Sequence, residues 1–220
     1  MTRPVRVSAA ILVGGKSRRM GTDKALIDVG GFPLIQRVLR AVRPLTSDLM
    51  LVGSGAERFA GHGQRPVADL TVGDGPLGGI YSALRAARFE HCLVLACDMP
   101  FLNTRLLHHL CQRAQEWDAL VPRLADGHLE PLHALYARTC IGAIESMLSA
   151  GLRSPLDLYG LVRTGHVAAS EIRRLDPDFR SFVNLNTPTE LALLREAPTL
   201  AAPRDGEPET RPGPCLGVAF

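Results

Sequence analysis

The sequence lacks the features by which membrane proteins and nucleic-acid coats are recognised. Its 220 residues contain no stretch approaching the ~20 uninterrupted apolar residues of a membrane span. The formal net charge of +3 is too small for a protein that coats nucleic acid. The N-terminus, MTRPVRVSAAILVGG, places basic residues before an apolar segment, but a highly charged loop follows in place of a small-residue cleavage site. We therefore interpret this segment as a first strand and expect neither a membrane nor a nucleic-acid partner.

Cysteine is also scarce and shows no paired metal-binding spacing. The odd number, five, argues against a complete disulfide framework. Reduced thiols in a cytoplasmic protein are the simplest interpretation. They are Cys92, Cys97, Cys111, Cys140 and Cys215.

What is present is an alternation of strand-like and helix-like segments, which predicts an α/β fold with a mostly parallel sheet and helices on both faces. Short apolar runs predict strands at residues 7–13, 48–53, 92–97, 118–122 and 131–136. Helical spacing of apolar residues predicts helices at 32–42, 81–89 and 104–114, and Ser154-Pro155 reads as a further helix start. Residues 73–80, GDGPLGGI, which precede the second helix, read as a glycine-rich turn.

The end of the chain differs in composition. Thr187 and Glu190 have the spacing of a capping box, which predicts one more helix start. From residue 197 onward proline, glycine and charge dominate. We therefore predict one domain over residues 1–196 and a mostly disordered tail over 197–220.

The first predicted strand runs into a basic, glycine-rich loop, GGKSRRMGTDK, at residues 14–24. Gly14 and Gly15 allow backbone amides to approach a phosphate, and Arg19 and Lys24 can neutralise its charge. Open α/β sheets bind ligands at the carboxyl ends of their strands. A solvated surface loop is the alternative, and the buried strand ahead of the glycines favours a phosphate site.

Two general nucleotide motifs fit this loop poorly. Residues 10–17 read A-x-x-x-x-G-K-S, a relaxed phosphate-loop pattern, but residues 11–13 continue the strand. The helix that should follow Ser17 is interrupted by the turn-forming residues 21–23. The dinucleotide fingerprint G-x-G-x-x-G is absent. Neither motif explains the loop.

The stretch LVGGKSRRMGTDKAL resembles the signature of the nucleotidyltransferases that act on the molybdenum cofactor, L-A-G-G-x-S-x-R-M-G-x-D-K, and departs from it only at Val13. Cytidylyl-transferring relatives usually carry L-A-A-G, so the second glycine favours the guanylyl branch. The resemblance implies a Rossmann-like nucleotidyltransferase in which Arg19 and Lys24 are catalytic. It implies nucleotide binding by Leu12, Val13, Gly14, Gly15, Lys16, Ser17 and Lys24.

The segment VADLTVGDGPLGGI, residues 67–80, corresponds in this family to an aspartate followed by G-P-L-A-G-I. The resemblance makes Asp69 a nucleotide contact, with Gly75 and Gly78 in a turn that forms one wall of the base pocket. An ordinary strand-to-helix turn is the alternative. Family members also tend to carry an asparagine after the second strand, which is missing here. Either Gly53 or Ser54 supplies backbone contacts instead, or the base pocket differs.

Asp98 follows the buried run CLVLAC and should emerge at the carboxyl edge of the sheet. A carboxylate buried there requires a cation, and Mg²⁺ favours one or two carboxylates together with phosphate oxygens. In the resembled family this aspartate is catalytic, binds the nucleotide and holds Mg²⁺. A helix cap or a structural salt bridge is the alternative.

The segment FVNLNTPTEL resembles a frequent ending of the guanylyl members, N-x-N-T-P-x-D-L. Asn184 and Asn186 have no local structural explanation, and we assign them to the rim of the site or to a second shell around the metal.

Together these features predict transfer of GMP from GTP to the phosphate of molybdenum-molybdopterin, with Mg²⁺ as the cofactor. Proteins of cofactor synthesis or an apoenzyme are further candidate partners. A related enzyme that uses CTP or a sugar phosphate, and a non-catalytic nucleotide-binding protein of cofactor delivery, stay open as alternatives.

Overall fold

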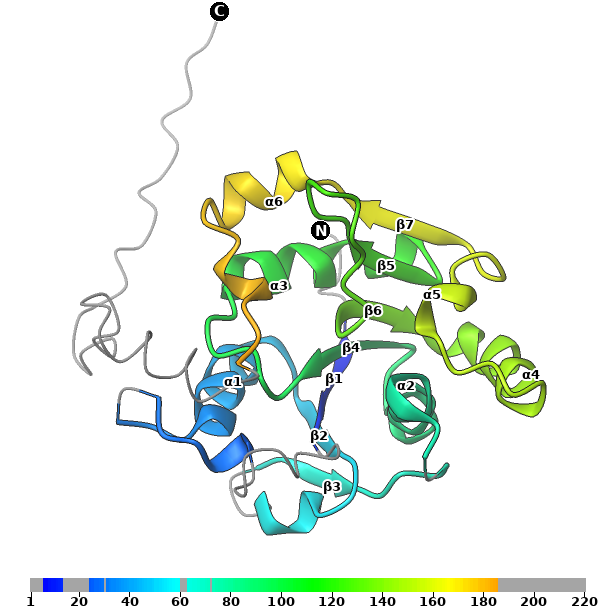
Figure 1. The fold of residues 1–220 in the computed structure, drawn as a ribbon, viewed down its shortest axis with the longest axis horizontal. Helices are drawn as coiled ribbons and strands as arrows, with labels where there is room; N and C mark the ends of the chain where they lie inside the picture. Colours follow the sequence, from blue (N-terminus) through cyan, green and yellow to red (C-terminus); the bar gives the residue numbers. More distant parts are fainter. Residues whose placement is uncertain (1–5, 14–23, 30, 60–62, 72, 186–220) are drawn as a thin grey trace, which may run out of the picture.

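The computed structural model describes residues 6–13, 24–29, 31–59, 63–71 and 73–185, and these form a three-layer α/β fold (Figure 1). Seven strands make one sheet in the order β3-β2-β1-β4-β6-β5-β7. The strands are β1 (Val7–Leu12), β2 (Asp48–Val52), β3 (Arg65–Val67), β4 (His91–Ala96), β5 (Ala119–Pro122), β6 (His133–Ala137) and β7 (Thr164–Val167). All pairs are parallel except those that β6 makes with β4 and β5. The predicted mostly parallel sheet is confirmed.

Helices cover both faces of this sheet, with α1 and α3 on one side and α2 and α4 on the other (Figure 1). They are α1 (Leu34–Val42), α2 (Gly75–Ala86), α3 (Thr104–Gln112), α4 (Ile141–Ser149), α5 (Pro155–Leu158) and α6 (Ala169–Leu175). Short 3₁₀ turns occupy Lys24–Leu26, Arg43–Leu45, Ala56–Phe59, Ala114–Glu116, Arg138–Cys140 and Arg180–Phe182. The predicted helix at 104–114 and the helix start at Ser154 are confirmed, whereas β3, β7, α4 and α6 had no prediction.

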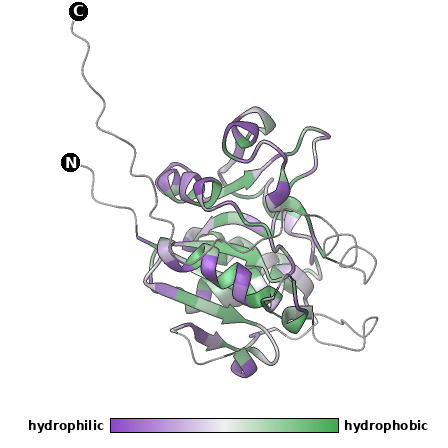
Figure 2. Cartoon of the chain, turned by 90° about the vertical axis from the view of Figure 1, so that its left-hand side faces the viewer, coloured by the Kyte–Doolittle hydropathy of each residue, from purple (hydrophilic) through white to green (hydrophobic). Residues whose placement is uncertain are grey.

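Alternating side chains of the strands form two separate cores, because successive residues of a strand point to opposite faces. In β1, Ala9 and Ile11 pack on the α1 and α3 side, and Ala10 packs on the α2 side. The apolar central strands lie beneath helices whose outer surfaces are more hydrophilic (Figure 2). Burial on both faces explains why β1 and β4 read as continuous apolar runs.

The prediction of a turn at residues 73–80 followed by a helix from residue 81 is wrong for residues 75–80. The helix α2 begins at Gly75 and includes these six residues. Pro76 suits a first helical turn, where its missing N–H costs no hydrogen bond. The glycines meet a packing requirement, since a Cβ on Gly79 would lie 2.8 Å from Leu12 Cδ1. Close contact between α2 and β1, and not a turn, accounts for this composition.

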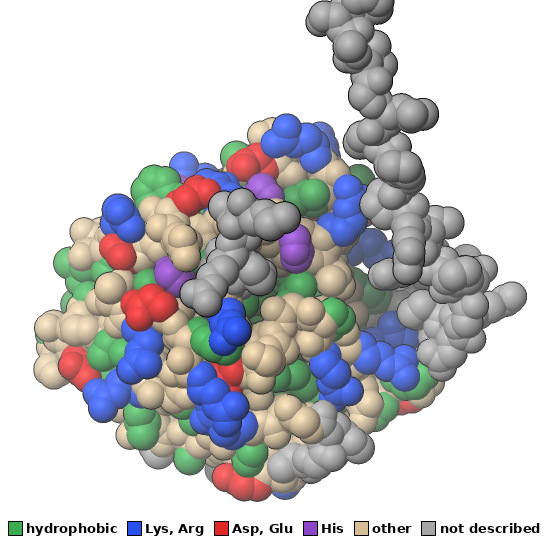
Figure 3. Space-filling model, turned by 180° about the vertical axis from the view of Figure 1, so that it is seen from behind, with side chains coloured by type: hydrophobic (Ala, Val, Ile, Leu, Met, Phe, Trp, Pro, Cys, Tyr) green, Lys and Arg blue, Asp and Glu red, His purple; other side chains and the backbone are tan. Residues whose placement is uncertain are grey.

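Charged side chains on the surface are mixed in sign. On the face shown in Figure 3, Asp and Glu side chains lie among the Lys and Arg side chains. No helix in the described part of the chain is long and apolar enough to cross a membrane. Residues 197–220 lie outside the described ranges, so the predicted tail stays a prediction, as does the cytoplasmic location.

A buried carboxylate ties three segments together at the amino edge of the sheet. Asp48, 3% exposed at the start of β2, accepts hydrogen bonds from Ser8 Oγ at 2.7 Å and from the Arg88 N–H at 3.0 Å. Arg65 Nη2 lies 3.1 Å from its other oxygen. Burial alone would raise the pKa of Asp48. The bonds from Ser8 and Arg88 and the charge of Arg65 outweigh burial, so this pKa is lowered.

Replacing this carboxylate should destabilise the fold in a pH-dependent way. Asp48→Ala should lower the free energy of unfolding by about 2–4 kcal/mol at pH 7, because buried donors lose their acceptor. A lowered pKa in the folded state contributes stability that is fully present above the unfolded pKa of about 4 and is lost below it. Urea unfolding between pH 7 and pH 3 should show the difference shrink below about pH 4. The exposed Asp178→Ala should show little change, and equal stability of both variants would refute this role of Asp48.

Candidate active site

The carboxyl ends of β1 and β4 lie side by side at one edge of the sheet. The two strands are parallel, with Leu12 opposite Ala96, and the Cys97 N–H donates to the Leu12 carbonyl at 3.3 Å. Asp98 therefore emerges next to the point where β1 leads into residues 14–23. Leu12 and Ile11 belong to β1, which agrees with rejecting a phosphate loop that would begin at residue 10.

The end of β2 holds Val13, the residue that follows β1. Val13 donates its N–H to the Val52 carbonyl at 2.8 Å. Gly53 follows with φ of 135°, and a Cβ there would lie only 1.8 Å from the Val13 carbonyl oxygen. Only glycine allows β2 to pass this close to the chain where it enters the candidate loop.

Asp98 is half-buried, and its backbone carbonyl accepts a hydrogen bond from the Leu185 N–H at 3.0 Å. It is not the cap of the following helix, because Asn103 caps α3 by accepting from the Arg105 N–H at 2.9 Å. One carboxylate at the end of a strand, beside a loop suited to phosphates, fits Mg²⁺, which takes its remaining ligands from phosphate oxygens and water. In the described ranges no group of three or more His, Cys, Asp or Glu side chains is placed to hold a metal.

The bond between Leu185 and Asp98 brings Asn184 to the same edge. Leu185 also packs with Val29 and Leu34, which anchors this segment against the start of α1. The Asn184 Oδ1 atom is buried without a hydrogen-bond partner in the described structure. An unpaired buried acceptor is costly, but such atoms also occur elsewhere in the described structure, so the assignment of Asn184 to the rim of the site stays a prediction.

Asp69 lies two residues beyond β3 and is half-buried. Burial raises the pKa of Asp69, and a hydrogen bond from the Ser54 N–H offsets this only in part. The Gly53 N–H is also engaged, with the Val67 carbonyl at 3.0 Å. Both N–H groups are therefore engaged within the protein, and the two explanations for the missing asparagine, other backbone contacts or a different base pocket, stay predictions.

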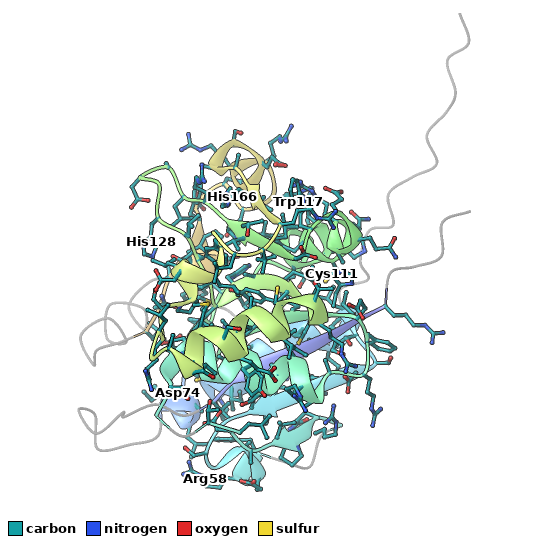
Figure 4. The ribbon with its side chains drawn as sticks, turned by 90° about the vertical axis from the view of Figure 1, so that its right-hand side faces the viewer. Arg58, Asp74, Cys111, Trp117, His128 and His166 are labelled. Carbon is teal, nitrogen blue, oxygen red and sulfur yellow. The ribbon has the colours of Figure 1, made fainter. Side chains whose placement is uncertain are left out.

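The start of α2 is held by an ion pair that the sequence did not indicate. Asp74, directly before the helix, lies 2.8 Å from Arg153 Nε of the connection between α4 and α5. Gly75 has φ of 61°, and a Cβ on Gly78 would lie 2.6 Å from Thr71 Oγ1. Both predicted glycines therefore shape how α2 approaches the site edge, on the side of the molecule where Figure 4 shows Asp74.

The remaining predicted site residues fall outside the described structure. These are Gly14, Gly15, Lys16, Ser17, Arg19, Asn186 and the side chain of Lys24. The backbone of Lys24 begins the first 3₁₀ turn, whose Ala25 packs into the core beside α1. The roles of these predicted site residues stay predictions.

The sequence and the fold of this chain are similar to those of known proteins. Residues 9–165 match the family described as the MobA-like NTP transferase domain. The chain is 40% identical over 191 residues to a probable molybdenum cofactor guanylyltransferase of Pelotomaculum thermopropionicum, covering 87% of this chain and 93% of that protein. It is 35% identical to the molybdenum cofactor guanylyltransferase of Syntrophotalea carbinolica, covering 82% and 86%. The crystal structure of molybdopterin-guanine dinucleotide biosynthesis protein A from Archaeoglobus fulgidus superimposes with a TM-score of 0.75 at 32% identity, covering 86% and 97%.

Gly53 provides a test of the packing at the site edge. Gly53→Ala should lower the free energy of unfolding by several kcal/mol, because the new Cβ must displace the Val13 carbonyl and the residue must keep a left-handed φ (of order 1–3 kcal/mol for the backbone alone). The matched control is Gly31→Ala, since Gly31 also has a positive φ, 86°, but open space at its Cβ position. Urea unfolding of both variants measures the difference. An equal loss in the two would show that φ alone, and not the contact with Val13, requires glycine.

Proposed function

Since this chain belongs to the MobA-like NTP transferase family, we propose that it transfers GMP from GTP to the terminal phosphate of molybdenum-molybdopterin, forming molybdopterin guanine dinucleotide and pyrophosphate. It is a nucleotidyltransferase, and the names of its relatives support this substrate pair. The structural observation that carries the proposal is the parallel pairing of β1 with β4, which places Asp98 beside the entrance to the glycine-rich loop.

The reaction needs no protein nucleophile. An ionised oxygen of the acceptor phosphate attacks the α-phosphorus of GTP, and the bond from this phosphorus to the bridging oxygen breaks, so that pyrophosphate carries away the negative charge. Both reactants are polyanions. The protein therefore contributes alignment of the two phosphates and positive charge around the phosphorus that reacts.

The residues divide these tasks. Lys16, Arg19 and Lys24 surround the β- and γ-phosphates, and Asp69 faces the nucleoside. Asp98 would hold Mg²⁺, which would supply positive charge against the phosphates. The close approach of Gly53 to the Val13 carbonyl and the hydrogen bond from the Leu185 N–H to the Asp98 carbonyl fix two strand ends. These support the proposal that the triphosphate binds between them.

Product analysis tests this function directly. The purified chain should convert GTP, Mg²⁺ and molybdate-loaded molybdopterin to a dinucleotide identified by its mass, with release of pyrophosphate. CTP and sugar phosphates, tested in parallel, should yield little product. Turnover with CTP or with a sugar phosphate in preference would replace the proposal with a related nucleotidyltransferase. Nucleotide binding without any product would instead indicate a protein of cofactor delivery.

Asp98 should be needed for turnover and not for folding. Asp98→Asn keeps the backbone bond to Leu185 but removes the charge, so turnover should fall ~10²-fold or more at an unchanged melting temperature. Binding of Mn²⁺ in the presence of GTP, followed by electron paramagnetic resonance, should weaken in the same variant. Asp178→Asn, a change of the same kind at an exposed site, should leave both unchanged. Full turnover of Asp98→Asn would refute the assignment.

A further inference from the structure

The order of the strands separates two sides of the candidate site. Asp69 follows β3, at one end of the sheet, whereas β6 adjoins β4 on the opposite side of β1. Under the proposed function, on which this inference rests, the nucleotide occupies the side of β1, β2 and β3. The acceptor must then approach Asp98 from the side of β6.

The reversed direction of β6 brings the residues before it to this edge. His133, the first residue of β6, lies opposite Leu95, and the Ala96 N–H donates to the Leu132 carbonyl at 3.0 Å. Residues 128–132 are thereby held near the carboxyl end of β4. Figure 4 shows His128 on the same side of the molecule as Asp74, which precedes α2.

Glu130 is the buried acid of this segment. The residue is 9% exposed. In the described part of the chain its ionic neighbour is His128, whose Nε2 lies 3.7 Å from Oε1 and whose side chain is 63% exposed. Burial raises the pKa of Glu130, and the carboxylates of Asp126 and Asp98 raise it further against the effect of His128. Among the described residues no hydrogen bond to the Glu130 carboxylate accompanies this ion pair, and its oxygens are not fully buried, so they are open to a ligand that supplies donors.

The backbone that carries Glu130 is fixed on both sides. Its N–H donates to the Pro122 carbonyl at 3.1 Å, and its carbonyl accepts from the His133 N–H at 3.1 Å. The next carbonyl, of Pro131, accepts from Tyr136 Oη at 2.8 Å, and that hydroxyl also pairs with Tyr159 Oη. The backbone that positions Glu130 is therefore fixed before any ligand binds, as a selective site requires.

We propose that Glu130 recognises the pterin of the acceptor by accepting hydrogen bonds from the 2-amino group and the adjacent ring N–H of its 2-amino-4-oxopyrimidine ring. Two oxygens of one carboxylate match two neighbouring N–H donors, the geometry that makes bidentate pairs strong. Guanine carries the same donor edge. Its expected position near Asp69, beyond β1 and β2, assigns Glu130 to the acceptor and not to the nucleotide.

Two fluorescent probes distinguish this recognition from a structural role. 6-Hydroxymethylpterin monophosphate presents the two donors, whereas the corresponding lumazine has a carbonyl oxygen in place of the 2-amino group. The native protein should bind the pterin about 10- to 100-fold more tightly than the lumazine. Glu130→Gln, whose amide can donate to that carbonyl, should lose this preference. Glu57→Gln, an exposed change of the same kind, should keep it.

Enzyme kinetics provide the second readout. Glu130→Gln should raise the KM for molybdopterin about 10- to 100-fold while the KM for GTP stays constant. An unchanged preference between the probes would overturn the proposal. A raised KM for GTP would show that the carboxylate reads guanine, and weaker Mn²⁺ binding without any pterin would show that it serves the cation. Dinucleotide formation by the native protein with an unchanged KM for molybdopterin in Glu130→Gln would remove this inference alone. No product and no probe binding by the native protein would remove the proposed function as well.

Discussion

Parallel pairing of β1 with β4 is the constraint on which the candidate site depends. Strands that run in the same direction end at the same edge, so the chain leaving Leu12 and the chain leaving Ala96 emerge as neighbours. The chain distance between these residues is large, and no local interaction could bring them together. Gly53 then closes one side of this edge by passing directly against the Val13 carbonyl. The position of Asp98 beside the loop is therefore a property of the sheet and not of either segment alone.

The amino and carboxyl edges of the sheet differ in the contacts that their polar side chains make. At the amino edge, Asp48 receives hydrogen bonds from three separate segments, which satisfies a buried charge and contributes to stability. Unpaired buried polar atoms occur near both edges of the described structure, with Arg65 Nε at the amino edge and Asn184 Oδ1 at the carboxyl edge. The amino edge is distinguished by the hydrogen bonds that converge on Asp48, and the carboxyl edge by the Glu130 carboxylate, whose ionic neighbour is His128 Nε2 at 3.7 Å. Under the proposed function, that carboxylate is available to a ligand.

The antiparallel direction of β6 adds a further segment to the edge of the sheet that carries the candidate site. Parallel strands contribute the loops that follow them, as β1 and β4 do. Because β6 runs the other way, it contributes the segment that precedes it, and Glu130 joins Asp98 at the same edge. Under the proposed function, the sheet presents the glycine-rich loop to the nucleotide on one side and the Glu130 carboxylate to the second substrate on the other. A nucleotidyltransferase that joins two different molecules needs this kind of division.

The sequence by itself determined the α/β class, the strands at the centre of the sheet and the resemblance carried by the glycine-rich loop and Asp98, because short apolar runs and contiguous motifs are local. It wrongly predicted a turn at residues 75–80. Their glycines are explained by the close packing of α2 against Leu12 and not by a turn. The pairing of Asp74 with Arg153, 79 residues apart, and the burial of Glu130 had no local signal. Only the tertiary structure decided these, because strand order, strand direction and helix packing are set by contacts between residues far apart in the chain.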